Sequence, residues 1–320
     1  MIDSHSHKQM AGRTGTLVLK RTLGYTKPVL YAAVCVLVVL TSACKGREAF
    51  EAVVFDGARA YEHVLAQVEF GPRPVGSEAL ERTVEYIESY LKAQGWKTWR
   101  EVVYYRDTPI LNVLAEKDVA TENGLPAIML GAHHDTRPYA DRDPDPANRL
   151  QPILGANDGA SGVAVLLEIA RVYDPARSRA NVVLAFFDGE DKGSIDGWPF
   201  SVGAGAVANE WAAKVSAMIL VDMIGDADQQ LYYERTSDAA LSREIWEAAA
   251  QLGYSQWFTP EERHTVLDDH SPFLRQGVPA VDIIDFDYPY WHTLADTADK
   301  VSPMSLERVG RVLLEYLYAK

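Results

Sequence analysis

Short runs of apolar residues recur along the chain, and several of them end in polar or acidic residues. Seven runs have the length and the Val, Ile, Leu, Phe and Tyr content of strands: 99–105, 110–116, 127–135, 181–188, 216–225, 231–234 and 278–285. Several are apolar at consecutive positions, which is typical of strands buried on both faces. The pattern therefore predicts an α/β fold, in which a central sheet is covered by helices on both sides.

Helical patterns lie between several of these runs. Residues 45–70 have the pattern of a helical lead-in. The next helix is expected to begin after Ser77, a favoured N-cap residue, and to end at Gly95, with one apolar face formed by Leu80, Val84, Ile87 and Leu91. Further helices are expected within 161–173, 237–252 and 305–319, and the chain contains no internal repeat. Alternation of strands and helices places the connections on the two faces of the sheet.

The first 44 residues differ in character from the rest. Lys20, Arg21 and Lys27 precede an uncharged apolar run at 28–40, and small residues follow up to Cys44. This order is typical of a secretory signal peptide, and the segment LTSAC resembles a lipoprotein cleavage site, at which the cysteine is lipidated. The apolar run is shorter than the about 20 residues that a membrane-spanning helix needs. An uncleaved signal anchor is the alternative.

We therefore expect residues 1–44 to be a signal peptide with a lipoprotein-type cleavage site, and residues 45–320 to form a single domain. The domain would lie outside the cytoplasm, and its contact with the membrane would be limited to the lipid on Cys44 or the signal anchor. Both cysteines of the chain, Cys35 and Cys44, fall in the leader. The domain then has neither a disulfide nor a cysteine nucleophile, and its stability must come from its core.

Composition and charge narrow the classes of partner. The chain has 320 residues, of which 48% are hydrophobic and 24% charged, as in ordinary globular proteins. Its net charge of −14 argues against a nucleic-acid partner, because binding to phosphates requires positive charge.

Ligand-type side chains follow three of the predicted strands directly. His133 and Asp135 follow one, Asp188, Glu190 and Asp191 the second, and Asp222 the third. Binding sites in sheets of this kind lie beyond the carboxyl ends of the strands, so these residues are expected to converge. Imidazole nitrogen and carboxylate oxygen are the donors of a divalent metal site. The full set of candidate ligands is His133, Asp135, Asp158, Glu190, Asp191, Asp222, His270 and His292.

Two of these candidates have simpler interpretations when taken alone. Asp158 lies in a Gly-rich turn before a predicted helix, so it could cap that helix. His292 could be a lone structural histidine. His63, His134 and His264 are interpreted as structural or surface residues. Gly189 is expected to let the chain turn as it leaves its strand, with Asp188 supporting that turn.

Five motifs, in order, resemble the zinc aminopeptidase family that also contains the animal-type glutaminyl cyclases. The motifs are HHD (133–135), GANDGASG (155–162), FFDGED (186–191), LVDMIGD (220–226) and WHT with its following DT and DK (291–300). The resemblance extends from about Phe70 to the C-terminus. It implies a zinc-exopeptidase-like fold, a three-layer α-β-α sandwich around a mixed, mostly parallel sheet, and it makes residues 45–320 a zinc-dependent catalytic domain.

The resemblance also implies roles for single residues. Asp158, Asp191 and His292 would hold the principal zinc, and Glu190 would be the general acid/base. In the aminopeptidases a second zinc, bridged by Asp158, is completed by residues that match His133 and Asp222. His133 and Asp135 lie on the same side of an extended chain, so one of them could bind the metal while the other orients it. Many family members have Glu where this chain has the shorter Asp191.

Features of the cyclase branch favour that activity. The segment 266–281 resembles the part of the cyclases that supplies an acidic residue and a histidine beside the pocket, here Asp268 and His270. Trp291 before His292 matches their pocket wall, and Trp198 would be a second wall. Asp222 and Asp268 would form the acidic side of the pocket. We expect one zinc per chain and peptide or protein N-termini as substrates.

Two alternatives remain open. The segment 292–302 is equally similar to the aminopeptidase branch, which would use two zinc ions to hydrolyse the first peptide bond. A non-catalytic lipoprotein that binds peptides is disfavoured, because every ligand and base residue type is present. Glu190 is the acid/base in both catalytic interpretations, so a pair of peptides, one beginning with glutamine and one with leucine, is needed to separate the two activities.

Overall fold

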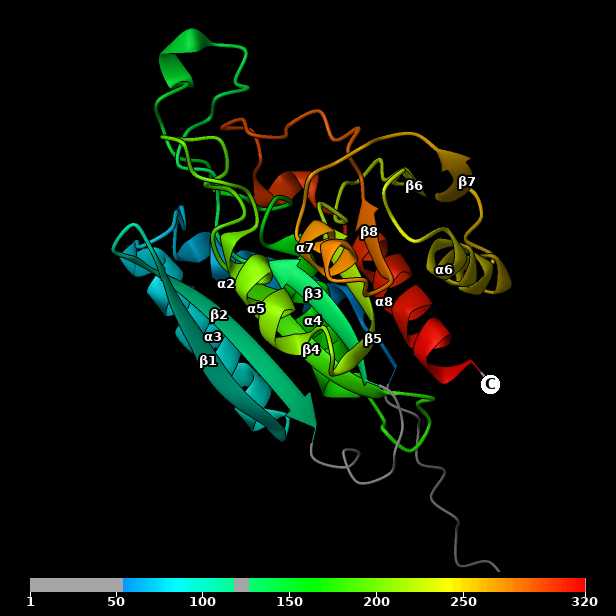
Figure 1. Cartoon of the computed structure of the whole chain (residues 1–320). Helices are drawn as coiled ribbons and strands as arrows, with labels where there is room; N and C mark the ends of the chain where they lie inside the picture. The colour runs from blue at the N-terminus through cyan, green and yellow to red at the C-terminus, as the bar shows by residue number, and fades with distance from the viewer. Residues whose placement is uncertain (1–53, 118–126, 320) are drawn as a thin grey trace, which may run out of the picture. The chain divides into compact units, whose positions relative to one another are not determined.

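Six strands form the central sheet of the computed structural model (Figure 1), which describes residues 54–117 and 127–319. In spatial order they are β1 (Trp96–Tyr105), β2 (Thr108–Lys117), β4 (Asn181–Phe187), β3 (Ala127–His133), β5 (Val215–Asp222) and β8 (Ala280–Ile284). The last four strands run parallel to one another. At the other edge, β2 is antiparallel to both of its neighbours, β1 and β4. The prediction of a mixed, mostly parallel sheet in an α/β fold is confirmed. The expected leader, with Cys44, lies outside the described residues.

Consecutive side chains of the inner strands enter two different hydrophobic cores. In β3, Ile128 and Leu130 belong to the core on one face of the sheet and Met129 to the core on the other. In β4, Leu184 belongs to the first of these cores and Val183 to the second. Successive side chains of a strand point to opposite faces, so an uninterrupted apolar run is what a sheet covered on both sides requires.

Helices cover both faces of this sheet. The larger core is completed by α2 (Gly57–Glu69), α3 (Glu78–Ala93), α4 (Ser161–Val172), α6 (Ala239–Gln251) and α8 (Pro303–Tyr318). The smaller core on the other face is completed by α5 (Val202–Trp211) and α7 (His270–Arg275). Figure 1 shows these two helical layers with the sheet between them, which is the expected three-layer sandwich. No helix among the described residues has both the length and the apolarity of a membrane span.

The helix boundaries follow the sequence signals where these are strong. The Ser77 hydroxyl accepts a hydrogen bond from the Leu80 N–H at 3.1 Å at the start of α3. Gly95 follows its end with φ of 78°, a left-handed conformation that favours glycine. Asp158, by contrast, does not cap α4, whose N-cap residue is Ala160 without a side-chain hydrogen bond. The capping interpretation of Asp158 is therefore wrong, and its carboxylate is available for another role.

Four elements depart from the expectations. The predicted strand at 231–234 is β6 (Leu231–Tyr233), which pairs with β7 (Phe258–Glu262) in a separate small sheet. The sequence did not indicate β7, because a proline and two acids interrupt its apolar pattern, nor α5, whose Gly and Ala residues give little periodicity. The short α7 was also unexpected. Two 3-10 turns, η1 (Pro146–Asn148) and η2 (Ala298–Lys300), complete the described elements.

A buried arginine ties the loops at the carboxyl end of the sheet together. Arg73 is fully buried, and its guanidinium donates to the carbonyl oxygens of Leu154 and Gly155 at 2.9 Å and of His134 at 3.2 Å. These carbonyls belong to the segment that follows β3 and to the turn that precedes α4. Their hydrogen bonds compensate the cost of burying the charge. Both loops are thereby fixed where the candidate ligands emerge.

Candidate metal centre and active site

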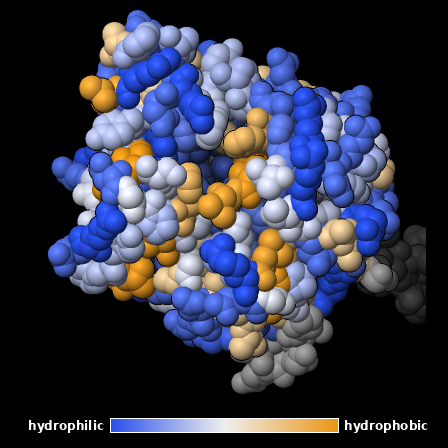
Figure 2. All heavy atoms as spheres, turned by 45° about the horizontal axis from the view of Figure 1, so that its top comes forward, coloured by the Kyte–Doolittle hydropathy of each residue, from blue (hydrophilic) through white to orange (hydrophobic). Residues whose placement is uncertain are grey.

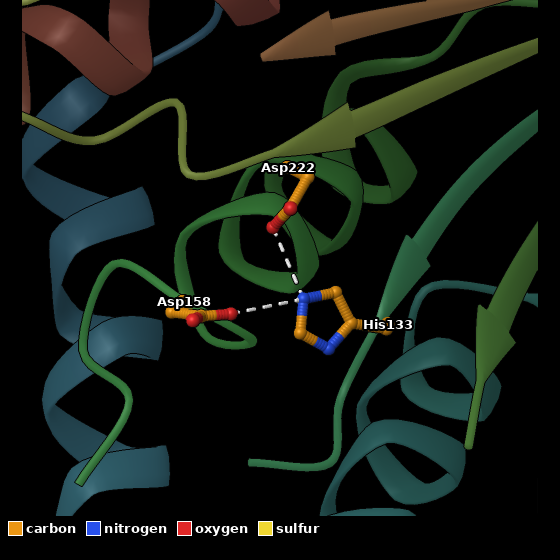
Figure 3. Close-up of side chains that lie close together, drawn as sticks. All are labelled: His133, Asp158 and Asp222. Carbon is orange, nitrogen blue, oxygen red and sulfur yellow. Dashed lines mark hydrogen bonds and ion pairs between the residues drawn. The ribbon is translucent and has the colours of Figure 1, made fainter. Parts of the chain in front are cut away.

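The candidate ligands converge at the carboxyl ends of the parallel strands. His133 is the last residue of β3 and Asp222 the last of β5, while Asp191 lies four residues beyond the end of β4. Asp158 reaches the same place from the turn before α4. Figure 3 shows the side chains of His133, Asp158 and Asp222 pointing toward one another. Three parallel strands that end at one edge bring together residues far apart in sequence, as expected.

The first ligand group joins His133 to two carboxylates. His133 Nε2 lies 3.0 Å from Asp222 Oδ1 and 3.3 Å from Asp158 Oδ1. The other ring nitrogen, Nδ1, lies 3.2 Å from the carbonyl oxygen of Asp135. All three side chains of the group are buried, and one donor atom of each lies within 4.8 Å of the others. This group could hold one divalent cation.

The second ligand group shares Asp158 with the first. His292 Nε2 lies 3.1 Å from Asp191 Oδ1 and 3.6 Å from Asp158 Oδ2. Asp158, Asp191 and His292 again place one donor atom each within 4.8 Å of the others. The backbone of His292 has φ of 53°, a left-handed conformation that is uncommon for non-glycine residues. Asp158 therefore lies between two possible cation positions.

Unpartnered buried oxygens indicate that a cation belongs here. Asp158 Oδ2 and Asp191 Oδ2 are buried without a hydrogen-bond partner. In the metal-free protein, burial and the negative charge of Asp191 raise the pKa of Asp158 to about 7. Buried carboxylate oxygens without donors are costly, and a divalent ion coordinated by both would remove that cost. The donor set of imidazole and carboxylate is one that divalent metals such as zinc accept.

Three further aspartates hold the ligands in place. Asp135 accepts hydrogen bonds from the backbone N–H groups of Glu190 (3.2 Å) and Asp191 (3.0 Å), so it fixes the acidic turn after β4 as well as facing His133. Asp296 accepts from the backbone N–H of Asp158 at 3.1 Å. Asp141 Oδ1 lies 3.1 Å from His292 Nδ1, which leaves Nε2 directed at the ligand group. Such outer partners orient metal ligands.

We predict that Asp141→Asn weakens zinc binding by about 10–100-fold, because His292 loses the carboxylate that orients its ring. Zinc affinity would be measured by competition with a chelator of known affinity. Asp145→Asn is the matched control in the same loop, since an asparagine there can still cap the turn at 146–148. Equal zinc affinities of the two variants would show that Asp141 does not position His292.

A small hollow lies directly against the ligand groups. Its volume is about 170 Å³ and its walls are formed by Asp158, Glu190, Asp191, Phe200, Asp222, Met223, Thr265, Val266, Leu267, Asp268, Ile284, Phe286, Trp291 and His292. Figure 2, which looks toward this end of the sheet, shows a hollow with hydrophobic residues beside it. The hollow thus combines acidic residues with apolar walls.

Glu190 lies in this hollow without belonging to the triad of Asp158, Asp191 and His292. Gly189, with φ of 79°, turns the chain so that the two neighbouring acids have different surroundings. Burial, together with the negative charges of Asp268 and Asp191, raises the pKa of Glu190 well above its usual range. Burial and Asp222 raise the pKa of Asp268 to about 6. Perturbed carboxyls of this kind are typical of proton-transferring groups.

The predicted pocket residues divide into two groups. Trp291 lines the hollow, with its ring centroid 4.1 Å from that of His292. Trp198 and His270 do not line it. The Trp198 ring packs instead on Tyr105 at 4.7 Å, and His270 is fully buried behind Asp268, with Nε2 3.0 Å from the Thr236 hydroxyl. The positions of Trp198 and His270 therefore argue against direct contact of either residue with the substrate.

Other residues of the site were missed from sequence. Asp141 stands in an acid-rich segment that looks like an exposed loop, and Asp296 was quoted only as part of a motif. Phe200, Leu267 and Phe286 line the hollow from three separate loops, so no spacing in the sequence links them. Asp188 was expected to support the turn after its strand. Its Oδ2 accepts a hydrogen bond from the Leu111 N–H at 2.7 Å, and the residue does not line the hollow.

Comparisons with known proteins agree with this site. Residues 112–317 match the model of Peptidase family M28. The glutaminyl-peptide cyclotransferase of Drosophila melanogaster is 27% identical over 290 aligned residues, which cover 78% of each chain. Two solved structures from Bacteroides thetaiotaomicron are 31% identical over 84% of this chain. One is a leucine aminopeptidase precursor (99% of that chain covered, TM-score 0.78), and the other is a glutaminyl cyclase bound to N-acetylhistamine (100% covered, TM-score 0.77).

Proposed function

Because the chain belongs to peptidase family M28, we propose that it is a zinc-dependent glutaminyl-peptide cyclotransferase. It converts the N-terminal glutamine of a peptide or protein to pyroglutamate and releases ammonia. The fold is common to cyclases and aminopeptidases, as the names of the two similar structures illustrate. The choice between them has to rest on the site itself.

The size of the hollow is the observation that carries this proposal. An apolar cavity of about 150 Å³ holds one benzene ring, and this hollow of about 170 Å³ also contains the faces of the metal ligands. An aminopeptidase must place the free α-amine and the carbonyl of the scissile peptide bond at the metal. It also needs space beside the metal for the side chain of the first residue. A cyclase must place the α-nitrogen and the side-chain amide of one glutamine there, and it leaves the peptide bond after that residue away from the metal. The available room suits a single N-terminal glutamine residue.

We assign the principal zinc to Asp158, Asp191 and His292, with one zinc per chain. A bound zinc would polarise the γ-carbonyl of the substrate glutamine as a Lewis acid. Asp141 would orient His292, and Asp135 would hold the backbone of Glu190 and Asp191. Trp291 would form one wall beside the glutamine side chain, so that the reactive rotamer is retained.

Glu190 is assigned the proton transfer. The α-nitrogen of the glutamine forms a bond to its own γ-carbonyl carbon, and the bond from that carbon to the amide nitrogen breaks. Glu190 takes a proton from the α-nitrogen and gives it to the departing amide nitrogen, which leaves as ammonia, and the raised pKa of Glu190 makes its carboxylate a stronger base for the first step. Asp222 and Asp268 form the acidic side of the hollow and would hold the protonated nitrogen groups.

A pair of substrates tests the proposal directly. We expect the zinc-loaded protein to release ammonia from a peptide that begins with glutamine and to release no free leucine from one that begins with leucine. Coupled detection of ammonia and analysis of free amino acids measure the two outcomes. Release of leucine without ammonia would establish the aminopeptidase activity instead.

The group of His133, Asp158 and Asp222 is the specific observation that favours the second candidate, an aminopeptidase with two metal ions. The same short distances also suit a hydrogen bond from His133 to Asp222, which a cyclase with one zinc would keep. Metal analysis therefore separates the two functions further. One zinc per chain supports the cyclase and two support the aminopeptidase.

We also propose that the protein acts outside the cytoplasm, attached to a membrane through a lipid on Cys44. The basic residues and apolar run before Cys44 support this assignment. Mass spectrometry of the protein isolated from membranes would identify the modification. An unmodified first residue at another position would refute lipidation at Cys44.

A further inference from the structure

A second, larger groove adjoins the catalytic hollow. Its volume is about 520 Å³, and it lies between the end of β1 at Tyr105, the helix α5 and the end of α7 at Arg275. Phe200 lines both the groove and the hollow, so the two are neighbours along one surface. The carboxyl end of β1 lies at the same end of the sheet as the catalytic residues, because β1 runs parallel to β4 through the antiparallel β2.

The groove is open because of small residues on α5. Val202, Gly205, Ala206 and Asn209 all line it. Their spacing of three and four residues places them on one face of the helix. A Cβ atom added at Gly205 would meet no atom within 4 Å other than those of adjacent residues and of its own helix backbone, so this face is free of neighbours at its centre. The far end is closed by the hydrogen bond from Gln276 Nε2 to Asn209 Oδ1 at 2.8 Å.

The wall of the groove nearest the hollow is held firmly. Arg106 donates from Nη1 to the carbonyl oxygen of Asp196 at 2.6 Å and from Nη2 to that of Gly197 at 3.0 Å. The Tyr105 ring packs on Trp198 with centroids 4.7 Å apart. These contacts tie the loop that carries Phe200 to the end of β1. The groove is therefore built between fixed elements.

The electrostatic character of the groove is opposite to that of the hollow. Five of the residues lining the hollow are acidic. Among the described residues that line the groove there is no aspartate or glutamate, and Arg275 is exposed there without an ion pair to a described residue. The groove suits a negatively charged or neutral partner.

We propose that this groove binds the part of the substrate that follows its N-terminal glutamine, in extended form, with an apolar residue beside Phe200 and an acidic side chain facing Arg275. The inference rests on the proposed function. The hollow has a volume of only about 170 Å³, so the residues that follow the N-terminal glutamine must continue outside it. The groove begins at Phe200, on the border of the hollow, and the charges of the two regions match a substrate with a positive N-terminus and an acid further along. The preferred substrates are then peptides several residues long with an acidic residue after the first.

A charge exchange at Arg275 tests this inference. We compare kcat/KM for pentapeptides that begin with glutamine and carry one glutamate at position two, three or four, and for the corresponding lysine peptides. At one of these positions we expect wild-type protein to prefer glutamate, and Arg275→Glu to lower kcat/KM for that peptide by about three- to tenfold and to raise it for the lysine peptide. Glutamine amide, which does not reach the groove, should be turned over equally by both proteins.

Two results would overturn the inference: equal glutamate-to-lysine ratios in wild type and Arg275→Glu, or the same change with glutamine amide. The groove is also tested apart from the reaction, by measuring Kd of the same peptides for zinc-loaded Glu190→Gln protein with and without R275E. A failure of wild type to cyclise glutamine amide contradicts the proposed function, whereas an unchanged Kd contradicts the groove.

Filling the groove provides an independent test. Gly205→Trp places a large side chain where no atom lies within 4 Å of the added Cβ, and Gly205→Ala is the matched control, since both remove a helix-disfavouring glycine. We expect G205W to lower kcat/KM for the pentapeptides at least about fivefold relative to G205A, with glutamine amide unaffected in both. Thermal unfolding confirms that both variants fold. Equal pentapeptide kinetics in the two variants would show that the peptide does not lie along α5.

Discussion

Glu190→Gln is expected to lower kcat by about 10²–10⁴-fold while the zinc content stays unchanged. Glutamine has nearly the shape of glutamate, and its backbone N–H can keep the hydrogen bond to Asp135. It can neither take the proton from the α-nitrogen nor return it to ammonia. Because Asp158, Asp191 and His292 form their ligand group without Glu190, the metal should remain.

Three measurements check this prediction: single-turnover kinetics, metal analysis and thermal unfolding. Asp196→Asn is a suitable control, since it makes the same kind of change in the following loop at a side chain that is 75% exposed. That variant should behave as wild type. If E190Q retained wild-type turnover with zinc bound, Glu190 would not be the acid/base, and Asp268 would become the next residue to test.

Asp158→Asn is expected to have the second large effect, because Asp158 belongs both to the group with His133 and Asp222 and to the group with Asp191 and His292. Loss of its charge should reduce zinc affinity by more than the about 10–100-fold typical of an outer partner such as Asp141, and activity should disappear with the metal. Neither a one-zinc nor a two-zinc site would be complete without it.

The same variant should have the opposite effect on the metal-free protein. Asp158 is buried beside Asp191 and Asp222, and these charges oppose its ionisation. An uncharged asparagine removes that repulsion, so we expect the chelated variant to be about 1–3 kcal/mol more stable than chelated wild type. Denaturant unfolding of both proteins with and without zinc measures this. A variant that binds zinc normally, or one less stable than wild type in both states, would contradict the assignment of Asp158 as the shared ligand.

The expected loss of zinc affinity and the expected gain in stability of the metal-free variant have one cause, the loss of one charge from a cluster of buried acids that repel one another. If both effects are observed, the acidic cluster is destabilising by itself and a bound cation stabilises it, so that part of the folding free energy of the zinc-loaded protein comes from the metal. Elements remote from the chemistry, such as Arg73, hold the loops in the geometry that the metal requires. Mutations at Arg73 should therefore affect metal binding as well as stability.

The sequence alone determined the class of fold and pointed to most of the candidate ligands. Apolar runs without alternation predict a sheet buried on both faces, since each face must bury its own side chains. Ligand-type residues that end three such runs are brought together at one edge by the parallel arrangement itself, so His133, Asp191 and Asp222 could be grouped in advance. Asp158 and His292 were candidates as well, but a helix cap and a structural histidine explained them equally well, and only the resemblance to a known family favoured the role of ligands.

The tertiary structure decided what surrounds those ligands. Asp141 orients His292 across 151 positions of the chain, and the walls of the hollow come from loops whose spacing follows no period. The same packing turned Trp198 and His270 away from the hollow, although their motifs had suggested contact with substrate. Local sequence encodes the periodicity of strands and helices, because that depends on neighbours along the chain. The volume of a pocket and the orientation of a ring depend on residues that meet only after folding, and these were available only from the structure.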